Sequence, residues 1–220
     1  MISITGLRLS HGPHVVVDNL TFLARPGEVV VLLGESGVGK TSLLRSLYGD
    51  LRPEDGVIHV DGVSVFPPDR RKFPSLRRRM GLIFQDDKLL DDRTVFENIR
   101  FALAIQSIHT DEARRRAMEV LSDLGLSHAR NKYPDQLSAG EAQRIGVARA
   151  LASHPRIILA DEPTGDLDLE TSRVIFQWLR GHNRDNTVMI IATHDAALAR
   201  EILPASRVLR MAHGSLDTVA

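Results

Sequence analysis

The sequence predicts an α/β fold whose core is a mostly parallel sheet. Apolar runs of strand length recur along the 220 residues, and helical patterns separate them. One such run, Val29–Leu33, leads directly into a glycine-rich loop, and a helix-like segment follows at residues 42–47. Strand, loop and helix in this order are typical of a parallel crossover unit. We therefore expect residues 1–220 to form a single domain that can carry a smaller subdomain.

Eight runs predict the strands of this domain. Residues 2–9 and 15–23 come before the glycine-rich loop and are expected to form a smaller antiparallel sheet with each other. Residues 56–65 alternate between apolar and polar side chains, which predicts one half-exposed strand. The remaining short apolar runs are residues 29–33, 80–84, 157–160, 187–193 and 207–211.

The stretch from residue 86 to residue 152 lacks strand patterns and is predicted to be mostly helical. Within it, Ala113, Ala117, Leu121 and Leu124 recur at helical spacing, and Thr110 or Asp111 is expected to cap that helix. We interpret residues 86–152 as a helical subdomain inserted into the α/β core.

Composition narrows the function classes. The formal net charge is zero, which argues against a dedicated nucleic-acid binder with a broad basic surface. The absence of cysteine excludes disulfides and thiolate chemistry and fits a reducing cytosol. The first residues do not resemble a signal peptide, and no apolar stretch approaches the roughly 18–20 residues of a membrane helix. Any membrane role is expected to depend on a partner.

The glycine-rich loop fits the phosphate-binding pattern G-x-x-x-x-G-K-[ST] at every fixed position. Its eight residues are Gly34, Glu35, Ser36, Gly37, Val38, Gly39, Lys40 and Thr41, and Ser42 follows in the same site. Backbone N–H groups of such a loop surround phosphates, the lysine reaches the β- and γ-phosphates, and the hydroxyl binds Mg²⁺. The expected ligand is a nucleoside triphosphate and the expected fold is of the P-loop NTPase type.

Two acids end the strand predicted at residues 157–160. Asp161 and Glu162 lie at its carboxyl end, where ligands bind in sheets of this kind. We expect Asp161 to hold Mg²⁺ and Glu162 to orient or deprotonate an attacking water. The alternative is that the pair only ends the strand before Pro163.

Three further positions carry weaker signals. Ser138 and Glu141 form an S-x-x-E capping box before a helical run, which needs no ligand, although a helix N-terminus can also bind an anion. Gln85 and His194 each follow a predicted strand. A single Gln or His at a strand end is usually a surface residue, and only their position in the whole set of motifs favours a functional role.

The order of these motifs resembles the ATP-binding cassette (ABC) ATPases. That family has a phosphate loop, a Gln, an LSGGQ-like signature, an acid pair, a D-loop and a switch histidine. The corresponding residues here are 34–41, Gln85, 137–141, 159–162, 165–168 and His194. The resemblance covers nearly the whole chain. It implies ATP and Mg²⁺ as cofactors and hydrolysis of ATP to ADP and phosphate.

The resemblance also implies a second copy of the chain as partner. In the family two cassettes pair head to tail, with ATP between the phosphate loop of one and the signature of the other. Ser138, Gly140 and Glu141 would then lie at the nucleotide of the other copy, and Asp168 of the D-loop would cross the interface. By the same likeness, Glu162 acts on water, His194 holds the γ-phosphate, and Gln85 contacts the metal and senses the nucleotide.

Within the family, the run Asp92-Arg93-Thr94-Val95 after Gln85 favours the FtsE-type branch, which acts in cell division with the membrane protein FtsX to control cell-wall hydrolysis. This likeness implies a peripheral protein on the cytoplasmic face of the bacterial inner membrane, with no nucleic-acid partner. The alternative is the ATPase of a lipoprotein-release or macrolide-type exporter. We expect residues 86–105 to form the groove for the membrane partner.

The chain departs from the family pattern in two places. Ala139 stands where the signature usually has glycine, and the capping box predicts that it is the first helical residue, where alanine is tolerated. The loop between the first two strands has no aromatic residue to stack on adenine, so His11 is expected to take that place with weaker stacking.

Overall fold

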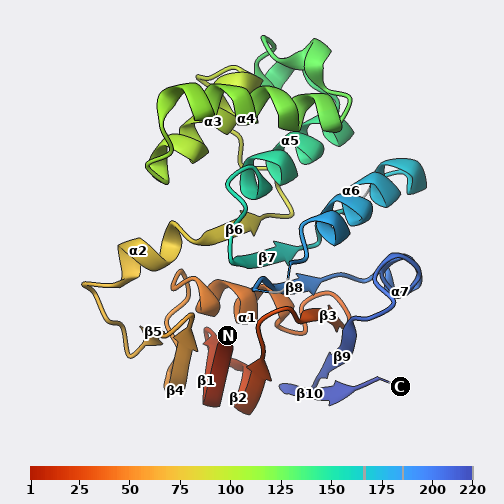
Figure 1. Ribbon diagram of the computed structural model, residues 1–220. Coiled ribbons are helices and arrows are strands. Elements are labelled where there is room, and N and C mark those ends of the chain that lie inside the picture. The colour runs from red at the N-terminus through yellow and green to blue at the C-terminus, as the bar shows by residue number, and fades with distance from the viewer. Residues whose placement is uncertain (166, 185, 220) are drawn as a thin grey trace.

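Two sheets and a group of helices build the molecule (Figure 1), a computed structural model that describes residues 1–165, 167–184 and 186–219. The four-stranded sheet has the order β2-β1-β4-β5, and the six-stranded sheet has the order β10-β9-β3-β8-β7-β6. The strands are β1 (Ile2–His11), β2 (His14–Ala24), β3 (Val29–Leu33), β4 (Asp55–Val60), β5 (Val63–Phe66), β6 (Met80–Ile83), β7 (Ile157–Asp161), β8 (Val188–Ala192), β9 (Arg207–Ala212) and β10 (Ser215–Thr218). The helices are α1 (Lys40–Leu47), α2 (Phe73–Arg77), α3 (Val95–Ile105), α4 (Thr110–Asp123), α5 (Ala139–Leu151), α6 (Leu169–Gly181) and α7 (Ala196–Ile202), with short 3-10 turns at Ser127–Ala129 and Pro134–Gln136.

The six-stranded sheet is parallel except for β10, which pairs antiparallel with β9. Strand β3 lies between β8 and β9 near its centre. The four-stranded sheet is antiparallel. The predicted α/β architecture, with a mostly parallel core and a small antiparallel sheet, is therefore confirmed.

Strand β3 explains why its sequence is apolar without interruption. Val30 and Leu32 pack into a core shared with α1 and the antiparallel sheet, whereas Val31 and Leu33 pack on the opposite side with α6 and α7. Both faces of the strand are covered, so all five of its side chains are buried. The strand thus holds the following loop on a rigid base.

The structure differs from the strand prediction in two places. Residues 56–65 form two strands rather than one, because Asp61 and Gly62 make a turn with positive φ angles of 47° and 76°. Two such residues in succession are the mark of a tight hairpin turn, and Asp-Gly favours it. Strand β10 at the sheet edge was not predicted, since its four residues alternate too briefly.

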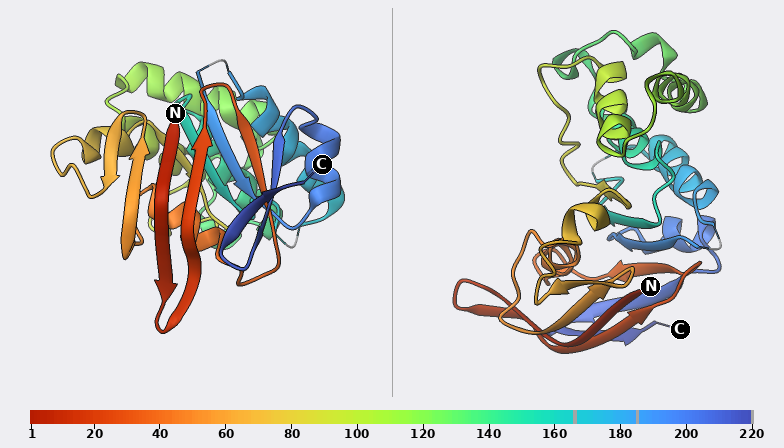
Figure 2. Two further views of the ribbon diagram at one scale, coloured as in Figure 1. Left: turned by 90° about the horizontal axis from the view of Figure 1, so that it is seen from below. Right: turned by 60° about the vertical axis from the view of Figure 1, so that its left-hand side comes forward.

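Helices α3, α4 and α5 form a group beyond the β6 edge of the six-stranded sheet (Figures 1 and 2), and α5 packs against β6. The buried residues of this group run from Leu89 to Ala152, which supports the proposed helical subdomain at residues 86–152. The prediction for the α4 cap was wrong: the N-cap is His109, not Thr110 or Asp111, and its side chain makes no capping bond. The longest helix in the described ranges has 14 residues, and none of those helices is long and apolar enough to cross a membrane.

Candidate nucleotide-binding site

The loop between β3 and α1 depends on glycine at three positions. Gly37 and Gly39 have φ angles of 80° and 111°, a backbone region that other residues rarely adopt. At Gly34 an added Cβ would lie 2.8 Å from the carbonyl oxygen of Met211, so any side chain would collide with β9. The loop can therefore hold its N–H groups toward a ligand only with these residues in place.

Lys40, the first residue of α1, has its charge at the centre of the loop. Its side chain is 6% exposed, and its Nζ donates to the carbonyl oxygens of Gly34 at 2.7 Å and Glu35 at 3.1 Å. The same Nζ lies 3.4 Å from Oε1 of Glu162. A buried ammonium group in this setting is well placed to bind an anionic ligand.

Thr41 and Asp161 bring two oxygen ligands together from α1 and the end of β7. The Thr41 hydroxyl donates to Oδ1 of Asp161 over 3.1 Å. Burial raises the pKa of Asp161, while the Thr41 hydrogen bond lowers it. Hard oxygen ligands of this kind suit Mg²⁺, which needs few protein ligands when phosphates and water supply the rest. The residues therefore fit the metal, and over the described ranges no cluster of three or more His, Asp or Glu competes for it.

Glu162 has a backbone φ of 43°, which is uncommon outside glycine. Its N–H bonds the carbonyl oxygen of Ala192 at 2.8 Å, and its Oε2 accepts from the His194 backbone N–H at 3.2 Å. The Nδ1 of His194 lies 2.9 Å from the same oxygen. The carboxylate is thus held between Lys40 on one oxygen and His194 on the other.

Lys40, Thr41, Glu162 and His194 line one cavity of about 680 Å³, and Asp161 reaches it only through its contact with Thr41. Of the residues predicted from sequence, the cavity brings together His11, Ser36, Gly37, Gly39, Lys40, Thr41, Ser42, Gln85, Glu162 and His194. Sequence analysis did not name two further lining residues, His14 and Val16, and it placed Gly165 only in the D-loop segment. His14 pairs with His11 across the turn between β1 and β2, which brings both side chains to the cavity.

The signature segment lies outside that cavity. Ser138 is the N-cap of α5 and accepts from the Glu141 N–H at 3.2 Å, while Oε2 of Glu141 accepts from the Ser138 N–H at 2.9 Å. These bonds, together with His128, hold the pKa of Glu141 at about 2. Helix α5 begins at Ala139, as the capping box predicts. Within the chain the segment is therefore a closed capping box, and Gly140 is its second helical residue.

Asp168 also acts as a helix cap. It is the N-cap of α6, where its Oδ1 accepts from the Thr171 N–H at 2.9 Å and its Oδ2 accepts from the Thr171 hydroxyl at 2.8 Å. It does not line the cavity. Asp166, in the same predicted D-loop, lies outside the described residues.

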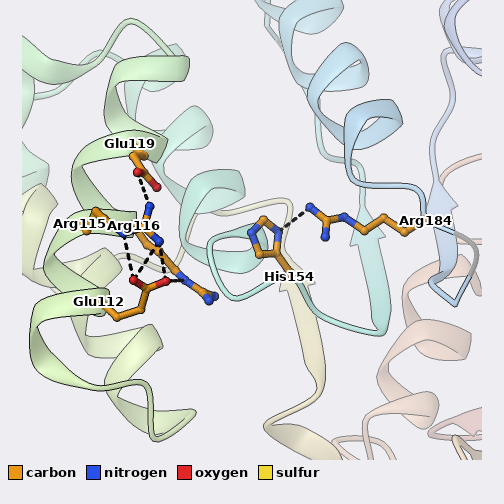
Figure 3. Close-up of polar contacts among 6 residues, drawn as sticks. All are labelled: Glu112, Arg115, Arg116, Glu119, His154 and Arg184. Carbon is orange, nitrogen blue, oxygen red and sulfur yellow. Dashed lines mark hydrogen bonds and ion pairs between the residues drawn. The ribbon is translucent and has the colours of Figure 1, made fainter.

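Two further groups of charged side chains contact one another outside the cavity. On α4, Arg115 and Arg116 bind Glu112, and the Arg184 Nη2 lies 3.4 Å from Nδ1 of His154 (Figure 3). None of these residues lines the nucleotide cavity.

Comparisons with known proteins place this geometry in a family. Residues 17–165 match the family model described as "ABC transporter". The cell division ATP-binding protein FtsE of Escherichia coli K12 is 41% identical over 187 residues, covering 85% of this chain and 84% of that protein. FtsE of Mycobacterium tuberculosis is 42% identical over 179 residues, covering 81% and 78%. The methionine import protein MetN of Carboxydothermus hydrogenoformans is 41% identical over 187 residues, covering 84% of this chain and 56% of that protein.

Solved structures of ABC transporter cassettes have the same fold as this chain. A dimeric structure of MJ0796, a bacterial ABC transporter cassette, superposes with a TM-score of 0.88 at 32% identity, covering 99% of this chain and 97% of the other. A second dimeric structure of MJ0796, in a post-hydrolysis state bound to ADP and phosphate, gives 0.88 at 30% identity, again over 99% and 97%. Fold, phosphate loop and family match together show that this chain belongs to the ABC transporter ATP-binding family and is an ATPase.

Proposed function

We propose that the chain is the ATP-hydrolysing subunit of an FtsE–FtsX-type membrane complex, peripheral on the cytoplasmic face of the bacterial inner membrane. The observation that carries this proposal is the likeness to FtsE proteins at 39% to 42% identity over more than three quarters of both chains. Because MetN matches at a similar identity, the branch has to be tested by identifying the partner.

The phosphate loop would bind the nucleotide. Five residues of the loop line the cavity that would take the β- and γ-phosphates, namely Ser36, Gly37, Gly39, Lys40 and Thr41. Thr41, Asp161 and Gln85 would hold Mg²⁺, which neutralises negative charge on the phosphates. His11 and His14 stand at the mouth of the same cavity and would contact the adenine.

Glu162 is the proposed general base. Water attacks the γ-phosphorus, Glu162 accepts the proton of that water, and the bond from the γ-phosphorus to the oxygen of ADP breaks. The two contacts of its carboxylate, with Lys40 and His194, hold the acceptor oxygen in one orientation. His194 would also bind the γ-phosphate, because its ring lines the cavity beside Glu162.

A second copy of the chain would complete the site. Ser138, Gly140 and Glu141 lie outside the cavity of their own chain, yet two structural neighbours are dimers. The Ser138 oxygen accepts one hydrogen bond, so its hydroxyl hydrogen is free to donate to a phosphate of the partner copy. Asp168 would lie at the same interface.

A groove of about 300 Å³ beside α3 would receive the membrane partner. Leu90, Phe101 and Ile105 form its apolar side, and Arg77 and Lys88 are among the basic residues around it. The exposed acids of segment 86–105, such as Asp91 and Asp92, do not line the groove, and the charged residues that do line it are basic.

Leu89 is no part of that groove. Its side chain is 9% exposed and packs into the helical core. The groove is therefore tested best at Leu90 and Ile105, the latter 52% exposed.

The test is to isolate the tagged protein from its own cells in mild detergent and identify the membrane proteins that accompany it. An FtsX-like protein is expected with the wild type and lost with Ile105→Asp. Val57→Asp is the matched control, since Val57 is an exposed apolar residue on β4 away from the groove. A lipoprotein-release, macrolide-export or methionine-import permease would overturn the cell-division assignment.

A further inference from the structure

One buried polar side chain on α5 has no role in the function described above. Gln143 is 6% exposed, and its Nε2 donates two hydrogen bonds. One goes to the carbonyl oxygen of Phe84 at 3.2 Å and the other to that of Pro163 at 2.9 Å. Phe84 immediately precedes Gln85, and Pro163 immediately follows Glu162. A single amide group therefore joins the loops that carry both residues.

The same face of α5 contacts the loop that carries Gln85 at two more points. At Gly146 an added Cβ would lie 3.3 Å from the carbonyl oxygen of Asp87, so a side chain there would push the helix and the loop apart by a few tenths of an ångström. The Arg149 guanidinium donates to the same Asp87 oxygen at 2.6 Å. Gln143, Gly146 and Arg149 are three residues apart, which places them on one side of the helix.

Helix α5 is the one that begins at the signature. Its N-cap is Ser138, and Gln143 lies little more than one turn further along. A shift or rotation of the start of α5 would therefore move the amide of Gln143, and with it both carbonyl oxygens that it binds.

We infer that Gln143 is a positioning residue that fixes the Gln85 and Glu162 loops relative to the signature helix. The inference rests on the proposed roles of Gln85 and Glu162. Gln143 should therefore affect the rate of ATP hydrolysis but not the affinity for ATP, because none of its hydrogen bonds reaches the phosphate loop.

The first test is Gln143→Met, which keeps the length of the side chain and removes its donor. We expect kcat for ATP hydrolysis to fall by about tenfold or more, with KM for ATP close to the wild-type value. A residue that only stabilised the fold would lower the melting temperature and leave kcat of the folded protein unchanged. That second pattern would overturn the inference.

A second variant gives a readout that simple destabilisation would not produce. In Gln143→Glu the ionised carboxylate would face two carbonyl oxygens, whereas the protonated acid can donate to one of them. Burial favours the protonated form. The kcat of this variant, relative to wild type at the same pH, is therefore expected to rise as the pH falls. A ratio that stays constant with pH would contradict the role of the donor.

Gln106→Met is the matched control. Its Nε2 donates one side-chain bond, to the Ser153 hydroxyl, and makes no hydrogen bond to either loop. It should leave kcat at the wild-type value, and an equal loss in both Met variants would overturn the inference. If Glu162→Gln hydrolyses ATP normally, the proposed catalytic role fails. If Glu162→Gln is inactive but Gln143→Met is fully active, the positioning role alone fails.

Discussion

Two helix N-termini in this molecule differ in how their backbone N–H groups are capped: one has no side-chain cap, and the other has a full capping box. At the start of α1, the N-cap is Gly39, which has no side chain to cap the helix, and the first turn has no acidic residue. At the start of α5, Ser138 and Glu141 satisfy each other's backbone N–H groups, and Glu141 supplies a negative charge. One end is open to an anion, and the other is already occupied by its own side chains.

This difference explains how much each region can do alone. The open end of α1 faces a cavity that also contains Lys40, Glu162 and His194, so the chain alone supplies a phosphate site. The capped end of α5 has the Ser138 hydroxyl hydrogen and the backbone N–H groups of Ala139 and Gly140 to offer an anion. In the proposed mechanism this end contributes to hydrolysis when another copy brings a phosphate to it.

The largest expected effect is that of Lys40→Ala. Removing the ammonium group should weaken ATP binding by about 2–5 kcal/mol, that is, roughly thirtyfold or more, because Glu162 is left without its cation. Calorimetry or a fluorescent ATP analogue measures the loss. Lys72→Ala, which removes an exposed lysine beside Asp69, is the control and should bind ATP normally. Wild-type affinity in Lys40→Ala would contradict the site.

Glu162→Gln should separate binding from chemistry. We expect ATP affinity to be kept and kcat to fall by about 10²–10⁴, the usual contribution of a general base. Closed dimers should then accumulate with ATP, which gel filtration detects. Glu119→Gln, an exposed acid on α4, is the control (Figure 3). If Glu162→Gln hydrolysed ATP as fast as the wild type, Glu162 would not be the general base.

Ser138→Ala compares the signature with a matched cap elsewhere. Thr94 and Glu97 form the same capping box at the start of α3, so Thr94→Ala is the control. Both variants should lose about 1 kcal/mol of folding stability. Only Ser138→Ala should also impair ATP-dependent dimerisation. If the two variants dimerise equally well, Ser138 is a helix cap and nothing more.

The smallest expected effect is a pH dependence of stability. Burial lowers the pKa of His182 below its usual 6.5, with a smaller opposing effect from the Trp178 carbonyl. The unfolded chain therefore binds a proton that the folded chain resists, so stability should fall as the pH drops below 6.5. His182→Gln should flatten that slope. Melting curves across the range measure it, and identical slopes would contradict the prediction.

The comparison of these two helix N-termini also shows which structural features can be predicted from local sequence patterns. The phosphate loop was predicted residue by residue because its backbone conformation requires particular residue types, such as glycine where φ is positive. The capping box at Ser138 was equally visible, because it is local. The turn at Asp61-Gly62 had a recognisable signal that a continuous alternating pattern obscured.

Contacts between segments that are far apart in the sequence could not be predicted from such local patterns. Nothing around Gln143 shows that its amide reaches both Phe84 and Pro163, since they lie 59 and 20 residues away. His14 enters the cavity through the β1–β2 turn rather than through a motif. Tertiary packing decides these positions, and local patterns do not encode it.

In the proposed dimer the open site of one chain is completed by the capped helix of another, and mixing two inactive variants tests this arrangement. Lys40→Ala keeps the signature and loses the phosphate loop. Gly140→Asp keeps the phosphate loop and puts a negative charge where the phosphate of the partner would lie. An added Cβ at Gly140 meets only ordinary contacts with Thr171, so this variant should fold.

Each variant alone should hydrolyse ATP far more slowly than wild type. In the mixture, one of the two sites of a mixed dimer combines an intact phosphate loop with an intact signature, so hydrolysis should reappear. If the mixture stays as inactive as its components, or if Gly140→Asp alone is fully active, the chain does not complete its site with a second copy.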